Sequence, residues 1–114
     1  MSAITTHVLD TAAGRPAAGV PVTLEARDRE GGWREVGRGV TDADGRLRDL
    51  LPAGRGLTEG AYRLSFDVQS YFDARGVEGF YAEVAVCFVV RDAGAHYHVP
   101  LLLSPYGYST YRGS

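Results

Sequence analysis

GVPVTLEAR, residues 19–27, is the stretch that decides the fold class of this chain. Apolar and polar side chains alternate along it, with Val20, Val22, Leu24 and Ala26 on one face and Pro21, Thr23, Glu25 and Arg27 on the other. A period of two residues is typical of a β-strand that buries one face and exposes the other. The stretch therefore predicts a half-buried strand in a sheet.

The same alternation recurs in AYRLSFDV, residues 61–68, and turn signals separate such stretches. The turn signals are REGGW (29–33), DADGR (42–46) and LPAGRG (51–56). Short alternating strands between glycine-rich turns predict an all-β fold, a sandwich of two sheets. We expect a short helix at SYFDARG, residues 70–76, and a second helical turn is a further possibility within residues 50–60.

Two stretches are apolar on both faces, EVAVCFVV at 83–90 and VPLLLSPYGY at 99–108. A sandwich buries only the inner face of each sheet. The second apolar face then needs a cover, and another copy of the chain is the simplest one. Cover by a loop of the same chain is the alternative.

Composition narrows the class of protein. The chain has 114 residues, the size of one domain, with 45% hydrophobic and 23% charged residues. The net charge is −2 and the basic residues are spread out, which argues against nucleic-acid and membrane partners. The single cysteine, Cys87, fits a reducing compartment. Residues 1–10 lack the charged and apolar regions of a secretory signal, so we expect a cytoplasmic protein.

Three histidines are the first candidates for chemistry: His7, His96 and His98. In a strand, His96 and His98 would share a face, and only folding could bring His7 to them. Histidine suits proton transfer because its ordinary pKa is about 6.5. A three-histidine zinc site is an alternative. No acidic residue within GAHYHVP, residues 94–100, could orient the ligands, so we expect no metal. For any histidine alone, a structural role is the simpler interpretation.

Most of the other candidate groups for chemistry lie in residues 96–114, HYHVPLLLSPYGYSTYRGS. Tyr108, Tyr111, Arg112 and Ser114 supply hydroxyl and guanidinium donors there. Arg46 follows the turn at DADG, which would present its side chain at the start of a strand. Each feature is weak alone, and no nucleophile elbow, phosphate loop or dinucleotide fingerprint accompanies them.

Three segments together carry a family resemblance: HVLDTAAGRPAAGVPVTLE (7–25), TDADGR (41–46) and residues 96–114. They closely resemble the transthyretin-related 5-hydroxyisourate hydrolases, and the resemblance covers essentially the whole chain. YRGS, residues 111–114, is the most specific mark, because it separates these hydrolases from the hormone carrier transthyretin.

The resemblance implies a transthyretin-like sandwich of about eight strands with one short helix, forming a single hydrolase domain over residues 1–114. It implies a homotetramer with active sites at the interface between dimers. The implied reaction is hydrolysis of 5-hydroxyisourate, a purine-derived substrate, to 2-oxo-4-hydroxy-4-carboxy-5-ureidoimidazoline without a cofactor, on the route from urate to allantoin.

The resemblance also implies roles for residues. The implied catalytic set is His7, Arg46, His98 and Ser114, and the implied substrate-binding set is Tyr111, Arg112 and Gly113. His7 and His98 would deprotonate the water, with the choice of base left open, and Arg46 would stabilise negative charge. His96 and Tyr108 would support these groups. The alternative functions are a transthyretin-like carrier of small aromatic ligands in a central channel and a structural sandwich module.

Overall fold

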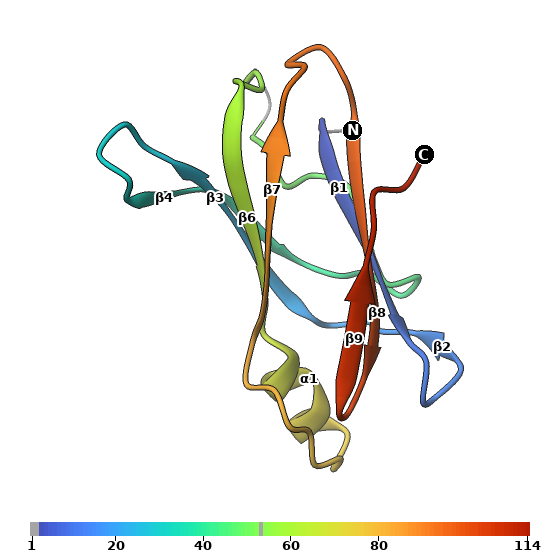
Figure 1. Ribbon diagram of the computed structural model, residues 1–114. Coiled ribbons are helices and arrows are strands. Elements are labelled where there is room, and N and C mark those ends of the chain that lie inside the picture. Colours follow the sequence, from blue (N-terminus) through green and yellow to red (C-terminus); the bar gives the residue numbers. More distant parts are fainter. Residues whose placement is uncertain (1–2, 53) are drawn as a thin grey trace.

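Two β-sheets face each other in the computed structural model, which describes residues 3–52 and 54–114 (Figure 1). The predicted strand at 19–27 forms β3 (Pro21–Arg27), an inner strand of the first sheet. That sheet has the order β4 (Trp33–Val40), β3, β6 (Gly60–Phe66) and β7 (Val84–Val90), and all its neighbours are antiparallel. The predicted fold class is therefore confirmed.

The second sheet contains the first and the last strand of the chain. Its order is β2 (Arg15–Pro16), β1 (Ile4–Asp10), β8 (Tyr97–Ser104) and β9 (Gly107–Thr110), and β5 (Arg46–Leu47) also pairs with β1. β1 and β8 run parallel along the whole of β1, so β2 and β5 share its other edge. The described residues contain nine strands, two of them only two residues long, against about eight expected.

The core lies between the sheets and is built by the alternation seen in the sequence. In β3 the predicted inward residues Val22, Leu24 and Ala26 are buried, whereas Arg27 is exposed. Fully buried partners come from every layer, among them Ile4, Val8, Leu64, Phe66, Val84, Leu101 and Leu103. Burying one such side chain stabilises the fold by roughly 1.5–3 kcal/mol, which ties both sheets to one register.

The predicted helix is present as α1 (Val68–Ala74), two residues earlier than expected. It starts there because the Asp67 carboxylate accepts a hydrogen bond from the backbone N–H of Ser70 and caps the helix. Its residues Tyr71 and Phe72 are buried against the rest of the protein. Figure 1 shows α1 at one end of the sandwich, on the chain segment that connects β6 to β7.

The second helical turn considered for residues 50–60 is absent from 50–52 and 54–60, and Ala53 lies outside the described residues. Pro52 lacks a backbone donor, and the glycines at 54 and 56 are poor helix formers. Within the described part of the chain, no helix has the length and apolarity that crossing a bilayer requires.

β7 lies at the edge of its sheet and has an apolar outer face. Val84 and Val90 are buried, but Ala85, Cys87 and Val89 are exposed. The consecutive leucines of β8 are divided in the same way, with Leu101 and Leu103 in the core and Leu102 half-buried on the opposite face. No loop among the described residues covers the outer face of β7, which leaves it available to another molecule.

Candidate active site

Strand pairing on β1 brings three of the predicted residues, His7, Arg46 and His98, to one face of a sheet. His7 stands opposite Arg46 of β5, and Thr5 stands opposite His98 of β8. Directly opposed residues point to the same side of a sheet, and the side chains of β1 alternate between its two sides. Thr5, His7, Arg46 and His98 therefore share the outer face of the second sheet, because Ile4 and Val8 fill the core on the other side.

The histidines have defined partners. The Thr5 hydroxyl oxygen lies 2.8 Å from Nδ1 of His98 and 3.1 Å from Nε2 of His96, and the two rings are nearly parallel with centroids 6.5 Å apart. Nε2 of His7 lies 2.9 Å from the carbonyl oxygen of Asp44. Because a carbonyl oxygen only accepts, Nε2 of His7 carries a proton and donates it.

The turn before β5 delivers Arg46 to this face. One carboxylate oxygen of Asp42 accepts hydrogen bonds from the backbone N–H of Asp44, at 2.9 Å, and of Arg46, at 3.0 Å. The Arg46 bond contributes most to lowering the pKa of the Asp42 carboxyl. Gly45 has a φ of +74°, and its carbonyl accepts from the N–H of Val8 at 2.7 Å. The turn is thereby fastened to β1 beside His7.

The segment after β9 closes the other side of the cluster. The backbone N–H of Gly113 donates to the carbonyl of His98 at 2.8 Å. A Cβ at Gly113 would lie 2.6 Å from Cδ2 of His98, so only glycine allows this approach. Ser114 then borders a small pocket of about 160 Å³. Its other lining residues are Thr5, Thr6, Arg46, Arg48, His96 and His98.

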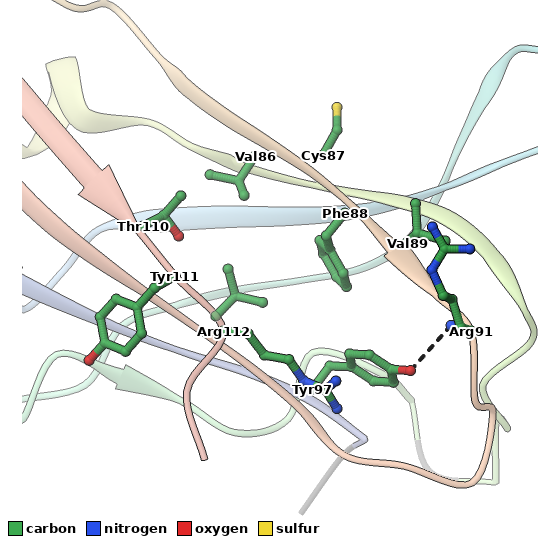
Figure 2. Close-up of a pocket in the computed structure, with 10 residues that line it drawn as sticks. Val86, Cys87, Phe88, Val89, Arg91, Tyr97, Thr110, Tyr111 and Arg112 are labelled. Carbon is green, nitrogen blue, oxygen red and sulfur yellow. Dashed lines mark hydrogen bonds between the residues drawn. The ribbon is translucent and has the colours of Figure 1, made fainter.

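Two predicted site residues lie elsewhere in the single chain. The guanidinium of Arg112 packs 4.3 Å from the ring centroid of Tyr97 and donates to the carbonyl of His96 at 3.3 Å. Tyr111 is 57% exposed. Both line a larger groove of about 340 Å³ between β7 and the β8–β9 edge, and Figure 2 shows Arg112 beside Tyr97 and Tyr111 directed away from both. Tyr108 packs edge-on against Tyr81 instead of joining the histidines.

Electrostatics favours neutral His98. Burial lowers the pKa of His98, and electrostatic interaction with the neighbouring Arg46, His7 and His96 lowers it further. A neutral imidazole has one bare nitrogen and can accept a proton. The pocket thus combines a proton acceptor with a permanent cation, the two groups that addition of water to a carbonyl requires.

Within residues 3–52 and 54–114, no group of three or more His, Cys, Asp or Glu side chains converges on a metal position. His96 and His98 share the Thr5 hydroxyl, whereas His7 faces the carbonyl of Asp44. Sequence reasoning missed Thr5 and Arg48 as site residues. For Thr5 a signal existed, since the alternation of ITTHVLD places it on the same face as His7.

The fold and the site together define the class: a two-layer β-sandwich with a small pocket, lined by imidazole and guanidinium groups, on the outer face of one sheet. The HIUase/Transthyretin family model matches residues 4–113, and the chain belongs to that family.

Three known proteins place the chain within the family. It is 50% identical to the 5-hydroxyisourate hydrolase of Caulobacter vibrioides over 119 aligned positions, covering 100% of both chains. The structure of Klebsiella pneumoniae 5-hydroxyisourate hydrolase has a TM-score of 0.83 at 35% identity and covers 97% of this chain and 98% of that one. Sea bream transthyretin in complex with thyroxine has a TM-score of 0.91 at 32% identity, covering 98% and 95%. Because hydrolase and carrier share one fold, only the site separates them.

Proposed function

We propose that this chain is a cofactor-free hydrolase that converts 5-hydroxyisourate to 2-oxo-4-hydroxy-4-carboxy-5-ureidoimidazoline, in urate degradation to allantoin. The observation that carries the proposal is the pocket in which His98, Arg46 and Ser114 meet. The hydrolases at 44–50% identity support it. In this proposal the predicted domain, residues 1–114, is the catalytic unit.

Ring opening follows from the groups present. His98 accepts a proton from water while the water oxygen bonds to a ring carbonyl carbon. The ring C–N bond then breaks, and the proton passes from His98 to the departing nitrogen, so one water is consumed. A positioned base contributes a factor of about 10²–10⁴. Arg46 stabilises the oxyanion between these steps, and removal of one such donor costs roughly 3–4 kcal/mol in other enzymes.

The remaining residues hold the ring and the water. His7 is anchored on the Asp44 carbonyl opposite Arg46, and in this proposal it contacts the substrate from that side. Ser114 lines the pocket, and Gly113 packs against the ring of His98. Tyr111 and Arg112 are proposed substrate contacts from the segment after β9.

The chemistry of the pocket also separates the hydrolase from the carrier. A site for an aromatic ligand is mostly apolar. The pocket beside His98 instead presents the guanidinium groups of Arg46 and Arg48 and the imidazole of His96. A polar, hydrolysable heterocycle fits these groups better than an aromatic hormone does.

For assembly and location we propose a cytoplasmic homotetramer with its active sites at the interface between dimers. The exposed apolar side chains support association, because Val89 on β7 is 48% exposed and Phe80 is 71% exposed. The free thiol of Cys87 is compatible with a reducing compartment.

The decisive experiment follows the ultraviolet absorbance of freshly generated 5-hydroxyisourate mixed with the protein. We expect rapid decay with the wild type and losses of at least about 100-fold in kcat for His7→Ala, Arg46→Ala and His98→Ala. Arg34→Ala, in an exposed position of β4, is the matched control and keeps full activity. A wild type no faster than buffer would overturn the hydrolase in favour of a carrier.

A second experiment, treatment with a chelator, tests whether the reaction needs a metal cofactor. We expect dialysis against a strong chelator to leave kcat unchanged. Loss of activity that zinc restores would replace His98 as the base by a metal-activated water.

A further inference from the structure

The Thr5 hydroxyl lies between two imidazoles that come from the far end of the chain. It is 2.8 Å from Nδ1 of His98 and 3.1 Å from Nε2 of His96, and Thr5 is only 4% exposed. A hydroxyl has a single proton to donate and two lone pairs to accept with. When it donates to one of these nitrogens, the other nitrogen must be the donor in its own hydrogen bond to the oxygen.

The direction of these bonds decides what His98 can do. If Thr5 donates to Nδ1 of His98, the proton of neutral His98 sits on Nε2 and that nitrogen cannot accept another. If Thr5 accepts from Nδ1–H, Nε2 is bare and is the only ring nitrogen left for a water proton. Only the second arrangement leaves His98 with a bare nitrogen that is not already occupied by the Thr5 hydroxyl proton.

The second arrangement also survives the proton transfer. Once Nε2 takes a proton, the imidazolium donates from both nitrogens, and its Nδ1–H bond to Thr5 is unchanged. In the first arrangement Nδ1 would gain the proton and meet the hydroxyl hydrogen, so Thr5 would have to rotate. Preorganised groups that need no such movement favour the reaction.

His96 supplies the reason for the direction. If His96 is neutral and carries its proton on Nδ1, its Nε2 is an acceptor 3.1 Å from the hydroxyl oxygen and can take the hydroxyl proton. The charged or titratable groups that lower the pKa of His98 are Arg46 from β5, His7 from β1 and His96. Arg48 also lines the pocket. All are basic, so no carboxylate side chain among them competes with Thr5 for the Nδ1 proton.

We propose that Thr5 is a positioning residue that donates to Nε2 of His96, accepts from Nδ1–H of His98, and so presents Nε2 of His98 as the general base. His96 acts through Thr5 as the acceptor that sets the direction. The inference rests on the proposed function, because the tautomer of His98 matters only if His98 takes a proton from water.

The test measures the His98 tautomer directly, by long-range proton–nitrogen correlation NMR of the histidine rings, together with kcat. In the wild type we expect Nδ1 protonated and Nε2 bare. Thr5→Val keeps the shape but removes the hydroxyl, so we expect a shift toward the other tautomer and a fall in kcat of about 10- to 100-fold, within the range of a lost general base. Thr5→Ser keeps a hydroxyl at this position, so we expect it to retain the wild-type His98 tautomer and kcat.

A matched control accounts for the loss of a buried hydroxyl as such. Thr41 is also 4% exposed, donates to the carbonyl of Ala17 at 2.7 Å and accepts from the N–H of Val20 at 2.9 Å, but touches no histidine. Thr41→Val should lower stability without changing the His98 tautomer. An equal change of tautomer in Thr41→Val would overturn the specific role of Thr5.

His96→Ala keeps the inference testable if Thr5→Val fails to fold, because His96 is exposed. With its acceptor removed, Thr5 is free to donate to His98, and we expect the Nε2-protonated tautomer and a kcat loss similar to that of Thr5→Val. The double variant should lose no more than either single one.

The outcomes are separable. An unchanged His98 tautomer in both Thr5→Val and His96→Ala overturns the inference and leaves the hydrolase intact. A wild type without hydrolysis overturns the proposed function, and the catalytic role of Thr5 with it, whatever tautomer the NMR reports.

Discussion

At the scale of a single residue, His98 is suited to act as a base because its surroundings disfavour the positively charged imidazolium. Burial is the largest cause, and Arg46, His7 and His96 add to it. A lowered pKa keeps the imidazole neutral near neutral pH, at the cost of some basicity. Arg46, the cation proposed to stabilise the oxyanion, therefore also helps to keep the base His98 neutral.

This arrangement predicts a pH profile. Activity should need neutral His98, so kcat/KM should fall as the pH drops through a pKa that lies below the ordinary histidine value of about 6.5. Removal of a positive neighbour should raise that pKa, so Arg46→Gln should move the NMR titration of His98 to higher pH. Arg34→Gln should not. A wild-type pKa above 6.5, or no rise in Arg46→Gln, would contradict the assignment.

At position 113, close contact with the His98 ring requires glycine. A Cβ there would lie 2.6 Å from Cδ2 of His98 and 3.3 Å from Cγ of Pro100. We expect Gly113→Ala to displace the His98 ring and lower kcat by about 10- to 100-fold, because a shift of about 1 Å can cost a hundredfold. Gly107→Ala places its Cβ 3.7 Å from the Ser104 hydroxyl, an ordinary contact, and should keep kcat. Equal activities of the two variants would contradict the role of Gly113.

At the scale of the elements, β1 contributes both to the core and to the candidate site. Its inward residues Ile4 and Val8 fill the core, whereas outward Thr5 lines the pocket and outward His7 lies beside it, opposite Arg46. β8 on one edge and β5 on the other bring His98 and Arg46 to those outward positions. Packing of the inner face therefore fixes the positions from which the outer face does its chemistry.

The segment after β9 belongs to the site more than to the fold. Its described contacts include the Gly113 N–H to His98 carbonyl bond and the packing of Arg112 on Tyr97, and no residue of 111–114 is buried. We expect deletion of Tyr111–Ser114 to abolish hydrolysis while lowering the free energy of unfolding by only about 1–2 kcal/mol. Thermal unfolding and the absorbance assay measure both. Retained activity would show that this segment is no part of the site.

For the whole molecule, the question is what covers the outer face of β7. Ala85, Cys87 and Val89 are exposed there on an edge strand, an arrangement that promotes association of chains. We expect light scattering to report four chains per particle at micromolar concentration. Val89→Glu should shift the population to smaller species, whereas Arg29→Glu, in an exposed turn, should not. A stable wild-type monomer would contradict the tetramer.

Local pattern was enough to predict much of the fold. The alternation in residues 19–27 and 61–68 predicted β3 and β6, because burial of one sheet face requires that period. The helix was predicted two residues late, because the cap at Asp67 is a local hydrogen bond that the alternation does not show. His7, Arg46 and His98 were individually weak candidates, and only the family resemblance grouped them.

The sequence by itself determined which side chains of each strand face the same way, since that depends only on neighbours along the chain. Tertiary structure alone decided that β1 pairs in parallel with β8, placing Thr5 against His96 and His98, which are 91 and 93 residues away. It also decided that Arg112 turns to Tyr97 while Gly113 approaches His98. The physical reason is that strand register is set by packing of the whole core, and a shift of one residue would turn the pocket residues inward.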